Sequence, residues 1–133
     1  MSRIGRALGV LVALAGVAGP AGAARAAGAA CAVEYKVSPY TGGFTTAITV
    51  FNTGDVEIRG WTFRFPLDPG ATVAEFYNAN LVSPSTVVVT TAKDWNSLVK
   101  PLTNISLGFR AIGTPGADPA WFTVNDLPCS RVG

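Results

Sequence analysis

The sequence predicts an all-β protein: a single antiparallel β-sandwich of the immunoglobulin-like or jelly-roll-like kind, with about seven to nine strands. From residue 31 onward, 29 of 103 residues are Val, Ile or Thr, which strands favour. Apolar and polar residues alternate with a period of two, and no stretch sustains the 3.6-residue period of an amphipathic helix. Turn-forming residues separate these runs at roughly ten-residue spacing. The chain of 133 residues is long enough for one such domain.

The expected strands follow the alternation in chain order. In residues 44–51 the even-numbered positions are mostly large and apolar, and in residues 61–65 the odd-numbered positions are aromatic. In residues 104–110 the odd-numbered positions are again apolar. Shorter runs complete the set at residues 33–37, 72–78, 86–90 and 122–125. We expect the core to be formed by Phe44, Ile48, Val50, Trp61, Phe63, Phe65, Ile105, Leu107, Phe109, Phe122 and Val124.

Residues 1–30 differ in composition from the rest of the chain. They contain 11 Ala, three Arg and no acidic or aromatic residue. Arg3 and Arg6 precede a short apolar run that Pro20 interrupts, and Ala-x-Ala sequences follow. This order predicts a secretory signal peptide with cleavage between residues 23 and 30. A membrane anchor is the alternative, but an Ala- and Gly-rich run broken by proline makes a poor spanning helix.

The domain that remains, residues 31–133, is therefore expected to be secreted and extracellular, without a membrane partner. Its two cysteines, Cys31 and Cys129, form an even pair in a compartment that permits disulfides. We expect a disulfide that joins the first residue of the domain to its last few. In the chain-entropy model, closing a loop of this length stabilises the fold by about 4–5 kcal/mol.

Charge and composition exclude several classes of function. Residues 31–133 contain seven Lys or Arg and eight Asp or Glu, scattered along the chain with a net charge of −1. A nucleic-acid partner is therefore not expected. The chain has no histidine, which excludes Ser-His-Asp and Cys-His catalysis and most transition-metal sites. We expect no catalytic residues, no metal and no cofactor.

A series of short motifs spans nearly all of the chain from Cys31 onward. In order, these are Gly43-Phe44-Thr45, Asn52-Thr53-Gly54, Gly60-Trp61-Thr62, Asp94-Trp95-Asn96-Ser97, Gly108-Phe109 and Phe122-Thr123-Val124-Asn125, with Cys31 and Cys129 at the ends. The series resembles family 2 carbohydrate-binding modules, the bacterial cellulose-binding domains. The resemblance implies a small disulfide-bridged β-sandwich that adheres to insoluble polysaccharide through three surface aromatics. These correspond to Tyr40, Tyr77 and Trp95, where the family usually has Trp at the first two positions.

An exposed aromatic ring suits a sugar, because a pyranose presents a face of C–H groups to the ring while its hydroxyls stay solvated. Each candidate also has a structural alternative: Tyr40 could be a turn residue and Tyr77 could cap the core. Trp95 lies between Asp94 and Asn96, where burial is difficult. Trp121 is expected to be exposed and is an accessory candidate only.

Polar side chains near the rings depart from the family pattern, which commonly has amides there. Candidates for polar contacts with sugar hydroxyls are Ser38, Glu75, Asn96, Ser106 and Arg110. Glu75 and Arg110 could instead form a solvated ion pair with each other. Gly43 stands where xylan-binding relatives usually have an arginine that turns the first ring edge-on, so the resemblance favours a flat strip and cellulose.

The sequence thus predicts a monomeric, secreted module that adsorbs to cellulose or a related insoluble β-1,4-glycan, with chitin and xylan as alternatives. A β-sandwich that has weakened or lost glycan binding and contacts a protein is a second possibility. A small glycoside hydrolase is a third, since Glu75 and Asp94 could approach each other. A sandwich of this size rarely forms the cleft that such chemistry needs, and we expect any hydrolysis to belong to attached catalytic domains.

Overall fold

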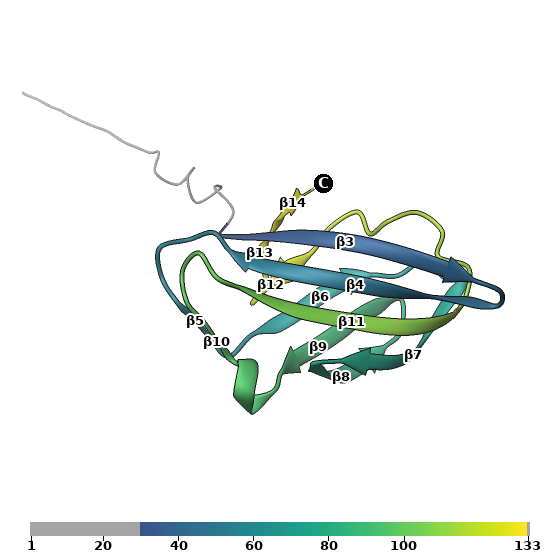
Figure 1. Ribbon diagram of the computed structural model, residues 1–133, viewed down its shortest axis with the longest axis horizontal. Coiled ribbons are helices and arrows are strands. Elements are labelled where there is room, and N and C mark those ends of the chain that lie inside the picture. The colour runs from purple at the N-terminus through teal and green to yellow at the C-terminus, as the bar shows by residue number, and fades with distance from the viewer. Residues whose placement is uncertain (1–29, 133) are drawn as a thin grey trace, which may run out of the picture.

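Two five-stranded sheets face each other in the computed structural model, which describes residues 30–132 (Figure 1). The first sheet has the order β14 (Ser130–Val132), β3 (Cys31–Tyr40), β4 (Gly43–Asn52), β11 (Asn104–Gly113) and β7 (Ala71–Tyr77). The second has the order β13 (Leu127–Pro128), β12 (Thr123–Val124), β6 (Thr62–Pro66), β9 (Val87–Ala92) and β8 (Ala79–Pro84). The predicted all-β sandwich is confirmed.

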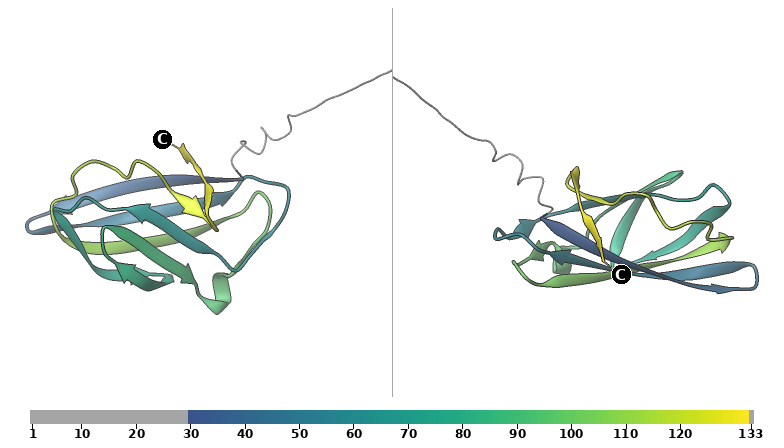
Figure 2. Two further views of the ribbon diagram at one scale, coloured as in Figure 1. Left: turned by 180° about the vertical axis from the view of Figure 1, so that it is seen from behind. Right: turned by 90° about the horizontal axis from the view of Figure 1, so that it is seen from above.

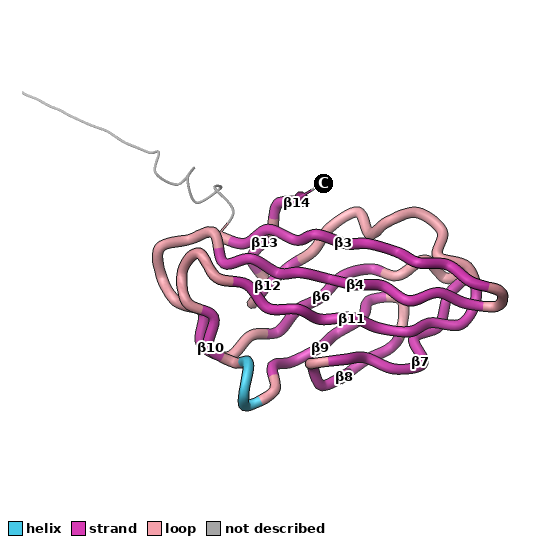
Figure 3. The backbone as a smooth tube through the Cα atoms, in the orientation of Figure 1, coloured by secondary structure: helices cyan, strands magenta, loops and turns pink. Residues whose placement is uncertain are grey.

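Strand pairing is antiparallel throughout both sheets except between β14 and β3, which run parallel. Two further short strands, β5 (Ile58–Arg59) and β10 (Leu98–Val99), pair with each other at one end of the molecule. A single 3-10 turn, η2 (Asp94–Asn96), follows β9 and is the one helical element of the part described (Figure 3). In the two other views β14, the last strand, lies beside the start of β3, with which it pairs (Figure 2).

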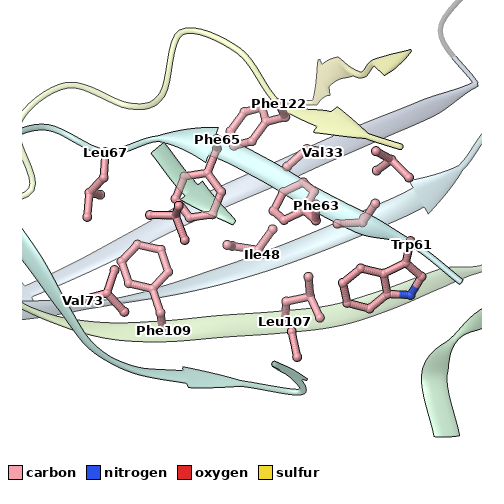
Figure 4. Packing of buried hydrophobic residues seen from close by; sticks show 14 of the residues in the cluster. Val33, Ile48, Trp61, Phe63, Phe65, Leu67, Val73, Leu107, Phe109 and Phe122 are labelled. Atoms are coloured by element: carbon pink, nitrogen blue, oxygen red, sulfur yellow. The ribbon is translucent and has the colours of Figure 1, made fainter. Parts of the chain in front are cut away.

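The core lies between the sheets and is rich in phenylalanine (Figure 4). Ten of the eleven residues predicted to face inward are buried, and Ile105 is partly buried against the same cluster. Phe63 stacks on Phe122 and Phe65 stacks on Phe109, with ring centroids 6.0 and 5.7 Å apart. Burying each such ring contributes about 1.5–3 kcal/mol, so this cluster dominates the stability of the fold.

Seven strands have five or more residues, which agrees with the predicted seven to nine. One of these seven, β8, was not predicted from the sequence. β8 contains Asn80 and Pro84, and its pairing with β9 shifts register between Leu81 and Ser83. Burial alternates along β8, but its sequence, ANLVSP, does not alternate between apolar and polar residues. Of the five strands of two or three residues, β12 lies within the predicted run at residues 122–125, and the other four are too short to produce a sequence pattern.

The disulfide between Cys31 and Cys129 is present and joins residues 98 positions apart. It attaches the start of β3 to the segment between β13 and β14. The predicted leader, residues 1–30, lies outside the described residues apart from Ala30. Within residues 30–132, no helix is long and apolar enough to cross a bilayer.

Candidate binding face

The outer side of the first sheet is a nearly flat platform of small residues. Outward positions on the central strands β4 and β11 include Thr45, Ala47, Ser106 and Gly108. Because side chains alternate across a strand, these residues face away from the phenylalanine core. Short side chains here leave room for larger ones at the sheet edges to lie across the platform.

Tyr40 lies across one glycine of this platform. It ends β3, pairs with Gly43 on β4 and is 50% exposed. A Cβ atom at position 43 would be 3.1 Å from the Tyr40 hydroxyl oxygen and 3.2 Å from its Cε1 atom. Gly43 is buried although its position faces outward, because the ring covers it. The same Cβ atom would be only 2.4 Å from the Ala111 carbonyl oxygen, so the backbone already excludes a side chain at residue 43, and the Tyr40 ring lies over the space that remains.

The Tyr77 ring also lies next to a glycine on the neighbouring strand. It ends β7, pairs with Gly108 on β11 and is 42% exposed. A Cβ atom at position 108 would be 3.6 Å from the Tyr77 Cδ2 atom. Both tyrosines thus combine an exposed ring with a glycine partner across the strand pair, an arrangement in which the aromatic compensates for the missing side chain.

Glu75 and Arg110 pair directly across β7 and β11, and their side chains form the ion pair that the sequence left as an alternative. Arg110 Nε donates to Glu75 Oε1 at 2.9 Å, and the Tyr77 hydroxyl donates to the same oxygen at 3.3 Å. Hydrogen bonds from Arg110 and then from Tyr77 lower the pKa of the Glu75 carboxyl below its ordinary value. Hydrogen bonds to Glu75 and to Tyr40 raise the pKa of the Arg110 guanidinium.

Trp95 is the most exposed of the three aromatics, at 70%, and lies in the 3-10 turn η2. The next residue, Asn96, holds this turn in place. Asn96 Oδ1 accepts from the Lys93 backbone N–H at 2.9 Å, and Asn96 Nδ2 donates to the Asn78 carbonyl at 2.7 Å. Since Asn78 directly follows Tyr77, this amide connects the turn that carries Trp95 to the end of β7.

Asn96 is 7% exposed, and both polar atoms of its side chain are occupied by backbone groups. The expectation that Asn96 could contact a sugar is therefore replaced by a supporting role beneath Trp95. The core also supports this turn, because the buried Trp61 Nε1 donates a hydrogen bond to the Asn96 carbonyl at 2.9 Å. Trp61 is buried, as predicted.

The remaining polar candidates and one unpredicted residue also lie on this face. Ser38 and Ser106 are exposed on β3 and β11, opposite Thr45 and Thr49 respectively. Ile112, which was not singled out from the sequence, is exposed on β11 opposite Gly43 and so extends the row that Tyr40 begins. Continuing the parity of residues 104–110 by one step would have found it.

Trp121 is 41% exposed and leads into β12 of the second sheet, away from the sheet that carries the tyrosines. Among residues 30–132, no group of three His, Cys, Asp or Glu side chains is placed to hold a metal ion. The same face carries a second ion pair, Lys36 with Glu34 on β3, at 3.6 Å. Beside these two mutual ion pairs it presents ring surfaces, hydroxyls and small apolar side chains, a mixture that suits a neutral polar ligand.

A disulfide-closed β-sandwich with exposed aromatics on one sheet face is the architecture expected of a carbohydrate-binding module. The sequence matches the family described as "Cellulose binding domain" over residues 31–129, and the chain belongs to this family, the family 2 carbohydrate-binding modules. The resemblance drawn from the motifs is thereby confirmed.

Relatives of known sequence are much larger proteins. Exoglucanase B of Cellulomonas fimi is 32% identical over 102 residues, which is 76% of this chain but 9% of that protein. Endoglucanase E-5 of Thermobifida fusca is 33% identical over 100 residues, 75% of this chain and 21% of that protein. The chain thus spans between about a tenth and a fifth of the length of these two relatives. Their names describe whole enzymes, whereas the family matched here is a binding domain.

Solved structures agree on the fold. A cellulose-binding family 2 domain from ScLPMO10C has a TM-score of 0.55 at 27% identity and covers 77% of this chain and 96% of that one. The chitin-binding domain of a chitinase from Pyrococcus furiosus has a TM-score of 0.55 at 28% identity, covering 73% of this chain and 93% of that one.

Proposed function

We propose that this chain is a secreted module that adsorbs to insoluble cellulose by stacking Tyr40, Tyr77 and Trp95 on glucose rings. The observation that carries the proposal is the pair of exposed tyrosines, each lying over a glycine on the flat outer face of the first sheet. A crystalline β-1,4-glucan exposes pyranose faces on a flat, uncharged surface. Rings that project little above a sheet can meet several sugars of such a surface at once.

The chemistry of the face supports an uncharged ligand. The charged pair closest to the rings, Glu75 and Arg110, is engaged in a mutual ion pair, so the centre of the face has no net charge. Adsorption should therefore depend on ring contact and change little with salt. The resemblance associates a glycine at position 43 with cellulose rather than xylan, and the structure has no room for a side chain there, since its Cβ atom would be 2.4 Å from the Ala111 carbonyl oxygen.

Secretion is part of the proposal and has two supports. Residues 1–30 have the composition of an export signal, and the Cys31–Cys129 disulfide suits an oxidising extracellular compartment. Any hydrolytic activity connected with this chain is proposed to reside in other domains or proteins, as the small share of the enzyme relatives that it covers suggests.

Chitin is a second candidate, favoured by the likeness to a domain named as chitin-binding at 28% identity. The two ligands share the β-1,4-linked pyranose backbone and differ in an acetamido group. The small outward residues Ala47 and Ser106 leave space beside the rings for such a group. Adsorption to both solids would be consistent with one face of this kind.

A pull-down tests the proposal. Residues 31–133 are mixed with microcrystalline cellulose, chitin and insoluble xylan, and the bound fraction is measured at low and high salt. We expect retention on cellulose, with Trp95→Ala weakening it at an unchanged thermal midpoint. Trp121→Ala is the matched control, since it removes an exposed indole from the other sheet and should bind normally. Retention on none of the three solids would refute the binding-module function, and retention on chitin alone would replace cellulose as the ligand.

A further inference from the structure

Two exposed tyrosines and an ion pair meet on the outer face of the first sheet. Tyr40 ends β3 and Tyr77 ends β7, while Glu75 and Arg110 pair across β7 and β11. Along the outward side of β11, Arg110 lies between Ile112, which pairs with Gly43, and Gly108, which pairs with Tyr77. Glu75 pairs with Arg110 at this middle position. The ion pair thus lies between the two tyrosines.

The tyrosine hydroxyls connect the rings to this ion pair. On one side, Tyr77 donates to the Glu75 oxygen that also accepts from Arg110. On the other side, the Tyr40 hydroxyl lies over Gly43, which pairs with Ile112 in the row next to that of Arg110, and the hydroxyl contributes to the raised pKa of the Arg110 guanidinium. The hydrogen bonds form a polar link, Arg110–Glu75–Tyr77, across β11 and β7, and the Tyr40 hydroxyl lies on its β3 side.

We propose that Arg110 and Glu75 are positioning residues that hold the Tyr40 and Tyr77 rings flat through their hydroxyls. The inference rests on the proposed function, since it assigns how that face is prepared for its ligand. The phenolic hydroxyl is the group that makes this coupling possible, because it can donate to the Glu75 carboxylate while the ring stays exposed. The tyrosines and the charged residues form one coupled unit.

Holding the rings before binding has a definite energetic effect. A side chain that must be immobilised on binding reduces affinity by about two- to tenfold, and rings already fixed avoid that loss. Tyrosine has a smaller face than tryptophan, so each ring contributes less stacking area. Fixing the rings in advance offsets part of that difference.

A direct contact between Arg110 and sugar hydroxyls is the competing explanation, and a double-mutant cycle separates the two. The four proteins are the wild type, Arg110→Met, the double variant Tyr40→Phe/Tyr77→Phe, and the combination of all three changes. Phenylalanine keeps the ring and removes only the hydroxyl. Adsorption isotherms on microcrystalline cellulose give the partition coefficient of each protein.

If Arg110 acts through the hydroxyls, Arg110→Met and the double Phe variant should each weaken adsorption about two- to tenfold, and the combination should be no worse than either. If the effects multiply, or if the Phe variants bind as tightly as the wild type, the positioning role is refuted. Arg64→Met is the matched control, because it breaks the exposed ion pair with Asp126 on the second sheet and should leave adsorption unchanged.

A readout without polysaccharide distinguishes failure of this inference from failure of the proposed function. The chain has three tyrosines, and Tyr35 is partly buried against the core, so it serves as an internal reference. In NMR spectra of the free domain with labelled tyrosine rings, Arg110→Met and Glu75→Gln should both shift the Tyr40 and Tyr77 signals and leave Tyr35 in place. Unchanged spectra would overturn the positioning role, whatever the wild type does on cellulose.

Discussion

Asn96 offers the sharpest test of how the structure supports Trp95. Asn96→Ala removes an acceptor for the Lys93 backbone N–H and a donor to the Asn78 carbonyl, and leaves these partly buried groups without those partners. Each hydrogen bond contributes about 1 kcal/mol, and a stranded polar group adds to the loss. We expect the free energy of unfolding to fall by about 2–3 kcal/mol. For a domain of about 100 residues this lowers Tm by roughly 10–20 °C.

The assay is urea unfolding with the disulfide intact, followed by intrinsic fluorescence, together with adsorption to cellulose well below the new midpoint. Adsorption should weaken as well, because the turn that carries Trp95 loses its connection to the end of β7. Asn96→Asp keeps the acceptor and loses the donor, so its stability should lie between the wild type and Asn96→Ala. Asn80→Ala is the matched control: it removes an exposed amide that donates to the Ala92 carbonyl and should change stability by less than about 0.5 kcal/mol.

The two explanations of Asn96 predict different pairs of results. A sugar contact would make Asn96→Ala weaken adsorption at an unchanged unfolding midpoint. If Asn96 supports the turn, Asn96→Ala should lower the free energy of unfolding, and adsorption should weaken as a consequence. If the free energy of unfolding of Asn96→Ala stays within about 0.5 kcal/mol of the wild-type value, Asn96 does not support the turn.

Two further predictions concern stability. Reducing the Cys31–Cys129 disulfide should lower the free energy of unfolding by about 4–5 kcal/mol in the chain-entropy model, measured by urea unfolding with and without reductant; a change below 1 kcal/mol would contradict that account. Burial raises the pKa of Tyr35 to about 12, above its unfolded value near 10. Its contribution is therefore complete below pH 10 and is lost as pH rises from 10 to 12, about 2–3 kcal/mol in all. Tyr35→Phe should remove this alkaline loss, and an equal loss in the variant would assign it to other groups.

Much of the fold could be predicted because alternation reports burial directly. Residues such as Phe44, Phe63 and Phe109 lie on strands with one buried face, where a period of two leaves one possible orientation. The pairing of Glu75 with Arg110 was also within reach, since outward parity and opposite charge were visible in the sequence. β8 was not, because its sequence does not alternate between apolar and polar residues.

The role of Asn96 could not be predicted for a different reason. Its position beside Trp95 in a polar segment indicates exposure, and the structure buries it instead. The burial depends on Asn78, 18 residues earlier in the chain, and on Trp61 in the core, neither of which has a sequence relation to Asn96. Tertiary contacts of this kind have no local pattern. The same holds for the Tyr77 hydroxyl, whose hydrogen bond to Glu75 shares an oxygen with Arg110, 35 residues away from Glu75 on the neighbouring strand.

The supports of the three aromatics are of two kinds, and this difference has a consequence for binding. Trp95 is held from below by buried groups, so its position depends on the stability of the core-facing turn. The tyrosines lie over glycines of the outer face, beside the exposed ion pair that their hydroxyls approach. Their positions therefore depend on local chemistry at the surface. Perturbing the ion pair should therefore change adsorption with little effect on unfolding, whereas perturbing the Trp95 turn should change both. Measured together, adsorption and stability identify which support a given substitution has damaged.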